Sequence, residues 1–231
     1  MSPLIQVTGL AYRYEDGTEA LRGIDFHLDP GECVAILGAN GSGKTTFVLH
    51  LNGLLTASSG TVKVCEMDVT KSNLPAIRRR VGLVFQDSDA QLFMPTVIED
   101  VMFGPLNQGL SQTEAQRRAL LALEQTGIAK LAQKAPYHLS SGEKRRAALA
   151  GILAMDPEVL VLDEPTTFLD PPGQRDLRDL LKALRQAKLI VTHDIPFARA
   201  LATRAVFFDS GRVAAEGPVE EIIQRFDWDF R

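Results

Sequence analysis

The stretch that decides the fold is Cys33-Val34-Ala35-Ile36-Leu37, followed at once by Gly38-Ala39-Asn40-Gly41-Ser42-Gly43-Lys44-Thr45. The first five residues are apolar on both faces, which is typical of a central parallel strand covered by helices. The next eight fit the pattern G-x-x-x-x-G-K-T between a strand and a helix, where glycines let backbone N–H groups surround phosphate oxygens. The positive end of the following helix attracts the same anion. The stretch therefore predicts an α/β fold that binds a nucleotide.

The parts of this loop have distinct expected roles. Lys44 should reach the β- and γ-phosphates, and the Thr45 hydroxyl should hold a magnesium ion. The predicted nucleotide-binding residues of the segment are Gly38, Asn40, Gly41, Ser42, Gly43, Lys44, Thr45 and Thr46.

Composition narrows the class of protein. The 231 residues are 45% hydrophobic and 23% charged, as in a globular domain, and the net charge of -4 disfavours an electrostatic nucleic-acid binder, so we expect no nucleic-acid partner. No apolar run reaches the roughly 18 residues of a membrane-spanning helix, and residues 1–7 do not resemble a secretory signal. Cys33 and Cys65 are expected to be buried thiols of a reducing cytosol. Any membrane role therefore requires a partner.

The hydrophobic pattern predicts an α/β core interrupted by helices. A helix is expected from Gly43 to about Leu55, with a break at Ser58-Ser59-Gly60. Residues 96–155 are mainly helical, with a helix also around 174–185. The leucines and isoleucine at helical spacing in 96–155 are Leu120, Leu121, Leu123, Leu149, Ile152 and Leu153. The expected strands are 4–7, 24–28, 33–37, 81–85, 159–162, 189–191 and 205–208.

A second acidic motif follows the apolar run Val159-Leu160-Val161-Leu162. A buried strand would deliver Asp163 and Glu164 to the sheet edge that carries the phosphate loop. Asp163 can then hold magnesium, and Glu164 can orient or deprotonate an attacking water. The alternative interpretation is an ordinary solvated acidic turn, and the neighbouring motifs favour the magnesium site over it.

These motifs, with others in the same order, resemble the ATP-binding-cassette family over essentially the whole chain. The further matching positions are Tyr14 at the adenine, Gln86 on magnesium and water, the signature segment Leu139-Ser140-Ser141-Gly142-Glu143, the dimer-contact loop Thr166-Thr167-Phe168-Leu169-Asp170, and the switch histidine His193. Each has an ordinary reading by itself: a surface glutamine, a satisfied histidine, a tyrosine packed on a strand edge, or a serine helix cap. Their order and spacing favour the family.

The resemblance implies an ATPase with ATP and Mg²⁺ as cofactors, acting as a dimer with a second copy or a related ATPase. It implies a P-loop NTPase core with a mainly parallel sheet, an N-terminal antiparallel β part and a helical insert. One domain would span 1–231, with the core at 1–95 and 156–231 and the insert at 96–155. The resemblance implies that the catalytic residues are Lys44, Gln86, Glu164 and His193 and that the magnesium ligands are Thr45, Gln86 and Asp163. The residues implied to contact the nucleotide of the other subunit are Ser140, Ser141, Gly142 and Glu143. Asp170 would contact the dimer partner.

Three positions depart from the family pattern. Ser141 replaces a usual glycine, Glu143 a frequent glutamine, and Phe168 a small residue in the dimer-contact loop. None of the three removes a catalytic group, so we expect hydrolysis to be retained with altered contacts.

The segment Asp89-Ala90-Gln91-Leu92-Phe93-Met94-Pro95-Thr96-Val97 is similar to the ATPases of energy-coupling-factor importers and of cobalt and nickel uptake systems. The resemblance implies uptake of cobalt, nickel or a vitamin, with a transmembrane coupling subunit and a substrate-capturing subunit as partners, at the cytoplasmic face of the cell membrane. Phe93, Met94, Val97 and Phe103 would line the groove for the membrane partner, or else pack in the insert core. The alternative function is a soluble ATPase of this family in cofactor assembly.

Two further features remain open at this level. The basic run Lys144-Arg145-Arg146 is read as a solvated helix face. The aromatic tail Phe226-Asp227-Trp228-Asp229-Phe230 either folds back on the domain or docks on a second subunit.

Overall fold

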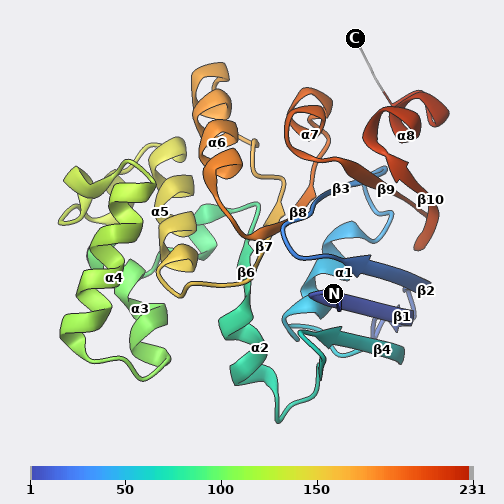
Figure 1. Ribbon diagram of the computed structural model, residues 1–231, viewed down its shortest axis with the longest axis horizontal. Helices are drawn as coiled ribbons and strands as arrows, with labels where there is room; N and C mark the ends of the chain where they lie inside the picture. The colour runs from blue at the N-terminus through green and yellow to red at the C-terminus, as the bar shows by residue number, and fades with distance from the viewer. Residues whose placement is uncertain (1, 229–231) are drawn as a thin grey trace.

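Two sheets and a group of helices make up the fold in the computed structural model, which describes residues 2–228 (Figure 1). The larger sheet has the strand order β10-β9-β3-β8-β7-β6, and the smaller one β2-β1-β4-β5. The strands of the larger sheet are β3 Cys33–Leu37, β6 Val81–Val84, β7 Val159–Asp163, β8 Ala187–Val191, β9 Arg204–Asp209 and β10 Arg212–Pro218.

The strand β3 lies inside the larger sheet, with parallel neighbours β8 and β9. Strands β6, β7 and β8 continue the parallel arrangement, and β10 adds an antiparallel edge. Residues Val34, Ala35, Ile36 and Leu37 are completely buried, as a strand covered on both faces requires. The predicted α/β fold with a mainly parallel sheet is confirmed.

The smaller sheet is antiparallel. Its strands are β1 Ile5–Arg13, β2 Glu19–Leu28, β4 Ser59–Val64 and β5 Met67–Asp68. Strands β1 and β2 are longer than the expected segments 4–7 and 24–28. The pattern missed β4 and β10; in β10 half-buried and exposed side chains alternate with none fully buried. An edge strand of this kind carries little hydrophobic signal.

Helix α1, Lys44–Leu51, ends four residues earlier than expected. Gly53 has φ +67°, and a Cβ there would lie 2.1 Å from the Leu74 side chain. A left-handed glycine just after the last turn is a common helix stop. Residues Ser58-Ser59-Gly60 therefore do not end the helix, since Ser59 already begins β4.

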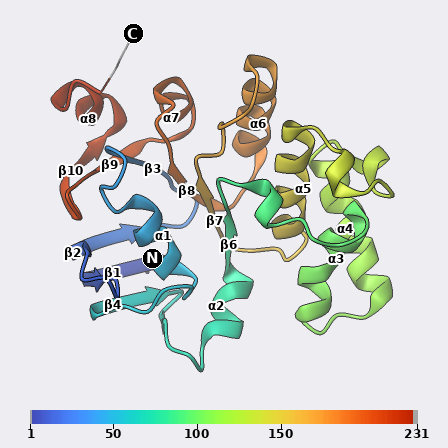
Figure 2. The same cartoon turned by 180° about the vertical axis from the view of Figure 1, so that it is seen from behind.

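Helices α3 Val97–Asn107, α4 Gln112–Gln125 and α5 Ser141–Leu153 lie together beside the sheets, and the chain crosses to them after β6 (Figure 2). Helix α4 buries Ala115, Ala119, Ala122 and Leu123. Leu120 and Leu121 lie in this predicted helix, and they are 41% and 51% exposed. Helical geometry explains the exposure, because both leucines point away from the face that the small alanines present to α3 and α5.

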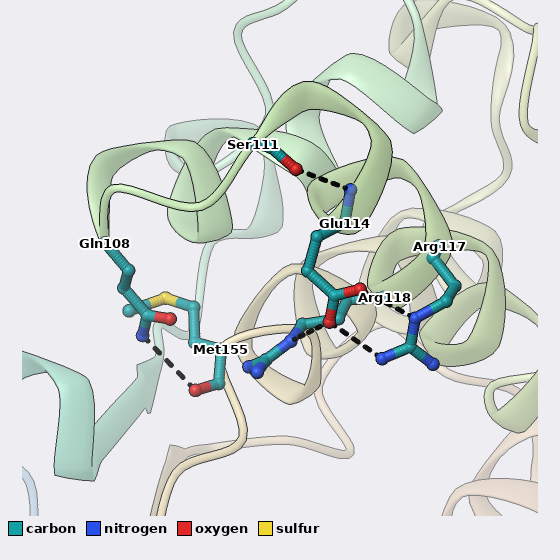
Figure 3. Close-up of polar contacts among 6 residues, drawn as sticks. All are labelled: Gln108, Ser111, Glu114, Arg117, Arg118 and Met155. Atoms are coloured by element: carbon teal, nitrogen blue, oxygen red, sulfur yellow. Dashed lines mark hydrogen bonds and ion pairs between the residues drawn. The ribbon is translucent and has the colours of Figure 1, made fainter.

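Side-chain contacts fix the turn between α3 and α4 (Figure 3). Ser111 caps α4 by accepting a hydrogen bond from the Glu114 N–H at 3.3 Å, and Glu114 pairs with Arg117 and Arg118. The Gln108 side chain donates to the Met155 carbonyl at 3.2 Å, which ties the end of α3 to the end of α5. Val97, for which the sequence left a partner groove or the insert core open, is completely buried in the core of this helical part, as the first residue of α3 after its Thr96 cap.

The remaining helices are α2 Leu74–Arg80, α6 Pro171–Ala183, α7 Ile195–Leu201 and α8 Val219–Arg225. None of the helices in residues 2–228 has the length and apolar character needed to cross a bilayer. Cys33 and Cys65 are free thiols that are half-buried rather than fully buried. The tail folds back on the domain as far as Trp228, whereas Asp229 and Phe230 lie outside the described residues.

Candidate active site

The phosphate loop is shaped by glycines in the left-handed region. Gly38, Gly41 and Gly43 have φ values of +137°, +76° and +104°. A Cβ on Gly38 would lie 2.2 Å from the Phe208 carbonyl oxygen, and one on Gly43 would lie 2.6 Å from that of Ala20. The loop therefore passes so close to neighbouring backbone that only glycine fits at these two positions.

Lys44, the first residue of α1, is held against this loop. Its Nζ donates hydrogen bonds to the carbonyl oxygens of Gly38 at 2.7 Å and Ala39 at 2.8 Å, and the residue is 6% exposed. Burial lowers the pKa of the ammonium, while Glu164 and Asp163 act to raise it. A positive charge is thus held at the loop, with two carboxylates close enough to influence it.

Asp163 ends β7 opposite the start of α1. The Thr45 hydroxyl donates to Asp163 Oδ2 at 2.9 Å. Burial raises the pKa of the Asp163 carboxyl, against the Thr45 hydrogen bond and the Lys44 charge. Asp163 Oδ1 is buried and has no hydrogen-bond partner within residues 2–228. Oxygen donors with one orphaned carboxylate oxygen suit a hard cation such as Mg²⁺, so the residues present fit the ion.

Glu164 lies beside His193 at the same edge. Its φ of +46° is unusual for a residue other than glycine, and such strain is common at functional sites. The His193 N–H donates to Glu164 Oε2 at 3.3 Å, and His193 Nε2 lies 3.0 Å from Asn40 Oδ1. His193 Nε2 also approaches Glu164 Oε1 to 3.2 Å, but without hydrogen-bond geometry, so this buried oxygen keeps no partner among the described residues.

The protonation of this pair suits base chemistry. Burial raises the pKa of the Glu164 carboxyl, and the nearby Asp163 charge adds to the effect. Burial, followed by the charge of Lys44, lowers the pKa of His193. A carboxylate with a raised pKa is a stronger base, and the neutral imidazole can act as an acceptor or a donor.

One pocket of about 670 Å³ brings most of the predicted residues together, a volume in the usual range for small-molecule sites. Predicted residues that line it are Tyr14, Asn40, Gly41, Gly43, Lys44, Thr45, Thr46, Gln86, Asp163, Glu164 and His193. The predicted residues Gly38 and Ser42 are buried within the loop and are not among the lining residues.

Tyr14 stands at the rim of this pocket. Its hydroxyl forms a hydrogen bond with Thr46 Oγ1 at 2.9 Å, and its ring contacts Tyr12 edge to face at 4.9 Å. The ring is therefore held next to the phosphate-loop helix, and its stacking on a base stays a prediction.

The signature segment lies away from the phosphate pocket. Ser140, Gly142 and Glu143 line a separate hollow of about 450 Å³ together with Asp170. Ser140 caps α5 in a reciprocal box: its N–H donates to Glu143 Oε2 at 2.8 Å, and the Glu143 N–H donates to Ser140 Oγ at 3.3 Å. Asp170 caps α6 by accepting from the Gly173 N–H at 2.9 Å. The structure does not bring this group to Lys44 of the same chain.

The dimer-contact loop carries an unusual backbone at Phe168. This residue has φ +65°, in the region that favours glycine, and 79% of it is exposed. Ser141, the other departure from the pattern, is also exposed at the start of α5. The two departures from the family pattern, Phe168 and Ser141, therefore change the surface of the protein and leave the interior of the phosphate pocket as it is.

Arg145 is a residue of the site region that sequence reasoning missed. It is 3% exposed, and its guanidinium donates to the carbonyl oxygens of Phe85 at 2.5 Å and Gln86 at 2.7 Å. The expected solvated face is therefore wrong for Arg145, whereas Lys144 and Arg146 pair with Asp89 and Asp176. The sequence did contain a signal for the burial of Arg145, because this residue lies four positions before the buried Leu149 and so on the same face of the helix.

Replacing Arg145 with methionine is expected to lower the free energy of unfolding by about 2–4 kcal/mol, because two carbonyl groups lose their donor. ATP hydrolysis should fall as well, since the segment that carries Gln86 is no longer tied to α5. Urea unfolding and phosphate release would measure the two effects. Lys144→Met, which removes an ion pair to the exposed Asp89, is the control and should change stability by less than about 1 kcal/mol. Equal stability of the two variants would contradict this role.

Comparison with known proteins agrees with the geometry. The family model described as ABC transporter matches residues 21–167. A putative ABC transporter ATP-binding protein of Geobacter sulfurreducens is 52% identical over 219 residues, covering 95% of this chain and 88% of that protein. The energy-coupling factor transporter ATP-binding protein EcfA of Methanosphaera stadtmanae is 44% identical over 227 residues, covering 96% and 82%.

A solved structure extends the likeness to the whole fold. It is cbiO1 from Clostridium perfringens, described as part of the ABC transporter complex cbiONQ, with a TM-score of 0.87 and 39% identity over 98% of this chain and 93% of that one. Family match, identity and shared fold coincide with a phosphate loop, an acidic strand end and the buried Glu164 carboxylate in one pocket. The chain therefore belongs to the ABC transporter family and is an ATPase subunit of an ABC transporter, which binds and hydrolyses ATP.

Proposed function

We propose that this chain is the motor subunit of an importer that takes up a transition-metal ion such as cobalt or nickel, or a vitamin, and that it works as a dimer of ATPase subunits. The observation that carries the dimer is the separation of the signature hollow from the phosphate pocket. A helix N-terminus with a glycine in its first turn, as Gly142 is in α5, can bind a phosphate, but the phosphates at Lys44 would lie in another pocket. A second subunit, identical or related, would supply the missing wall.

Within one half-site we assign the roles as follows. Lys44 and the loop N–H groups bind the phosphates, and Tyr14 contacts the adenine. Thr45, Asp163 and Gln86 would hold Mg²⁺, which when bound neutralises phosphate charge. Glu164 offers a buried oxygen without a hydrogen bond, so it can accept a proton from the attacking water. The water oxygen bonds to the γ-phosphorus, the bond to the β–γ bridging oxygen breaks, and ADP and phosphate leave.

His193 and the opposing segment complete this assignment. The imidazole Nε2 lies 3.2 Å from Glu164 Oε1 and 3.0 Å from Asn40 Oδ1 of the phosphate loop, so it can sense a γ-phosphate and keep the base in line. Ser140, Ser141, Gly142 and Glu143 would contact the nucleotide of the other subunit, with Asp170 and Phe168 near the junction. Breaking the phosphate contacts on hydrolysis would loosen the pair.

An exposed apolar patch supports docking of a membrane partner. The rings of Phe93 and Phe103 contact each other edge to face at 4.9 Å, and they are 62% and 42% exposed. Leu106, one helical turn beyond Phe103, is 40% exposed, and Met94 is half-buried beside Phe93. The patch follows Gln86 in the chain, so a transmembrane coupling subunit seated there would sense the nucleotide. Such a partner would hold the chain at the cytoplasmic face of the cell membrane.

The proposal is tested by purifying the tagged chain from its own cells in mild detergent and identifying what copurifies. We expect a multi-helix membrane protein and a small substrate-capturing subunit, whose bound ligand identifies the cargo. Phe103→Glu should abolish this copurification without lowering basal hydrolysis. Recovery of the chain with cytosolic proteins alone would overturn the importer and favour a soluble ATPase of cofactor assembly.

A further inference from the structure

The C-terminal segment after α8 packs its aromatic rings on strand β9. Phe226 stacks on Phe207 with ring centroids 3.8 Å apart and planes 2° apart. Trp228 meets the same ring edge to face, at 5.0 Å and 86°. The Trp228 N–H donates to the Ile223 carbonyl at 3.0 Å, which turns the chain back toward α8. The position of Trp228 is therefore set by both backbone and ring contacts.

The strand under these rings is joined to the phosphate loop. Phe207 pairs with Leu37 in the parallel ladder of β3 and β9, and Gly38 follows Leu37. Trp228 also packs against the apolar cluster that contains Ile195, the first residue of α7. Ile195 is two residues after His193. The tail thus packs on β9, which pairs with the strand leading into the phosphate loop, and on the start of α7, which follows His193.

Trp228 reaches the histidine itself. The ring centroids of His193 and Trp228 are 6.4 Å apart, with planes tilted by 33°, a separation at which aromatic rings interact. The polar contacts of the imidazole go to Asn40 and Glu164. The histidine side chain is 40% exposed, so the polar contacts by themselves leave it room to move.

We infer that Trp228 is a positioning residue for His193: its indole limits the orientations of the imidazole and keeps it directed at Glu164. The inference rests on the proposed role of His193 in hydrolysis. Removing the indole lets the imidazole occupy other rotamers, so the fraction of chains with an aligned base falls. The ATP contacts at Lys44 and Tyr14 are untouched. The maximal rate should therefore fall while the KM for ATP stays the same.

The first experiment compares kcat and KM for ATP in five variants. We expect Trp228→Ala to lose about tenfold in kcat with KM within twofold, and Trp228→Phe to restore most of the rate because it keeps a ring. Phe226→Ala is the matched control, since it removes the stacked ring from Phe207 but not the ring next to His193. It should lower the melting temperature with little change in kcat. His193→Ala gives the loss of kcat when the histidine is absent altogether. The double variant Trp228→Ala/His193→Ala should lose no more kcat than His193→Ala alone.

The second experiment uses the fact that Trp228 is the one tryptophan in the sequence. Excitation at a wavelength that selects tryptophan reports on it in a chain with an unaltered tail. In Glu164→Gln, ATP should change the emission as His193 turns to the γ-phosphate. In Glu164→Gln/His193→Ala the same titration should give no change. This readout does not depend on the folding of a Trp228 variant.

The outcomes separate the two claims. Normal hydrolysis by His193→Ala overturns its proposed role. A collapsed His193→Ala rate beside an unchanged Trp228→Ala rate overturns the positioning role alone. Equal kcat losses in Trp228→Ala and Phe226→Ala, or an emission change that survives His193→Ala, would mean that the tail only stabilises the fold.

Discussion

Replacing Glu164 with glutamine is expected to lower ATP hydrolysis at least about a hundredfold while ATP binding is retained. The buried Oε1 without a hydrogen bond is the proton acceptor in the proposed step, and an amide cannot take that proton. Glutamine keeps the shape of the side chain and its contact with the His193 N–H. ATP should therefore stay bound and hold two subunits together, which light scattering with ATP would show as a dimer.

The same substitution makes a stability prediction with a defined sign. Burial raises the pKa of Glu164 in the folded chain, so stability contributed by its protonated form is lost as pH rises through that pKa. At neutral pH the charged form disfavours folding, and the neutral amide removes this effect. The melting temperature of the variant should be equal to or above that of the parent chain.

Glu158→Gln is the control for both measurements. Glu158 lies just before β7, at the opposite end from Glu164, and pairs with Arg80 on the surface. Its loss should leave hydrolysis within about twofold and slightly lower stability. Normal turnover by Glu164→Gln would exclude Glu164 as the base.

Replacing Gly38 with alanine is expected to lower the free energy of unfolding by about 3–5 kcal/mol and to weaken ATP binding at least tenfold. The new Cβ would lie 2.2 Å from the Phe208 carbonyl oxygen, and φ of +137° strains any L side chain. Relief requires the loop to move off β9, which displaces the carbonyl oxygen that Lys44 Nζ contacts. Urea unfolding and titration with a fluorescent ATP analogue would measure the two effects.

Gly41→Ala separates strain from steric exclusion. Gly41 also has positive φ, +76°, but a Cβ there meets nothing within 4 Å. Its substitution should cost about 1–2 kcal/mol, the ordinary cost of a left-handed alanine. If both variants lose the same stability, the close approach of Gly38 to Phe208 does not matter in solution.

Local signals sufficed for the strands and loops that are buried or strongly patterned. The apolar run before Gly38 predicted β3 with correct bounds, and the run before Asp163 predicted β7 to within one residue. Both strands are covered on two faces, so nearly every side chain carries the signal. Strand β10 was missed, because the exposure of an edge strand depends on what packs beside it and not on its own residues.

The sequence by itself determined that the chain has a phosphate loop, an acidic strand end and a cap-like signature segment, because each depends on residue types a few positions apart. Only the tertiary structure decided that Arg145 is buried with its guanidinium on the carbonyl groups of Phe85 and Gln86, and that Trp228 approaches His193. Each of these contacts joins residues that are 35 or more positions apart in the sequence, as His193 and Trp228 are. Their existence depends on how the sheets and helices pack, which no short pattern contains.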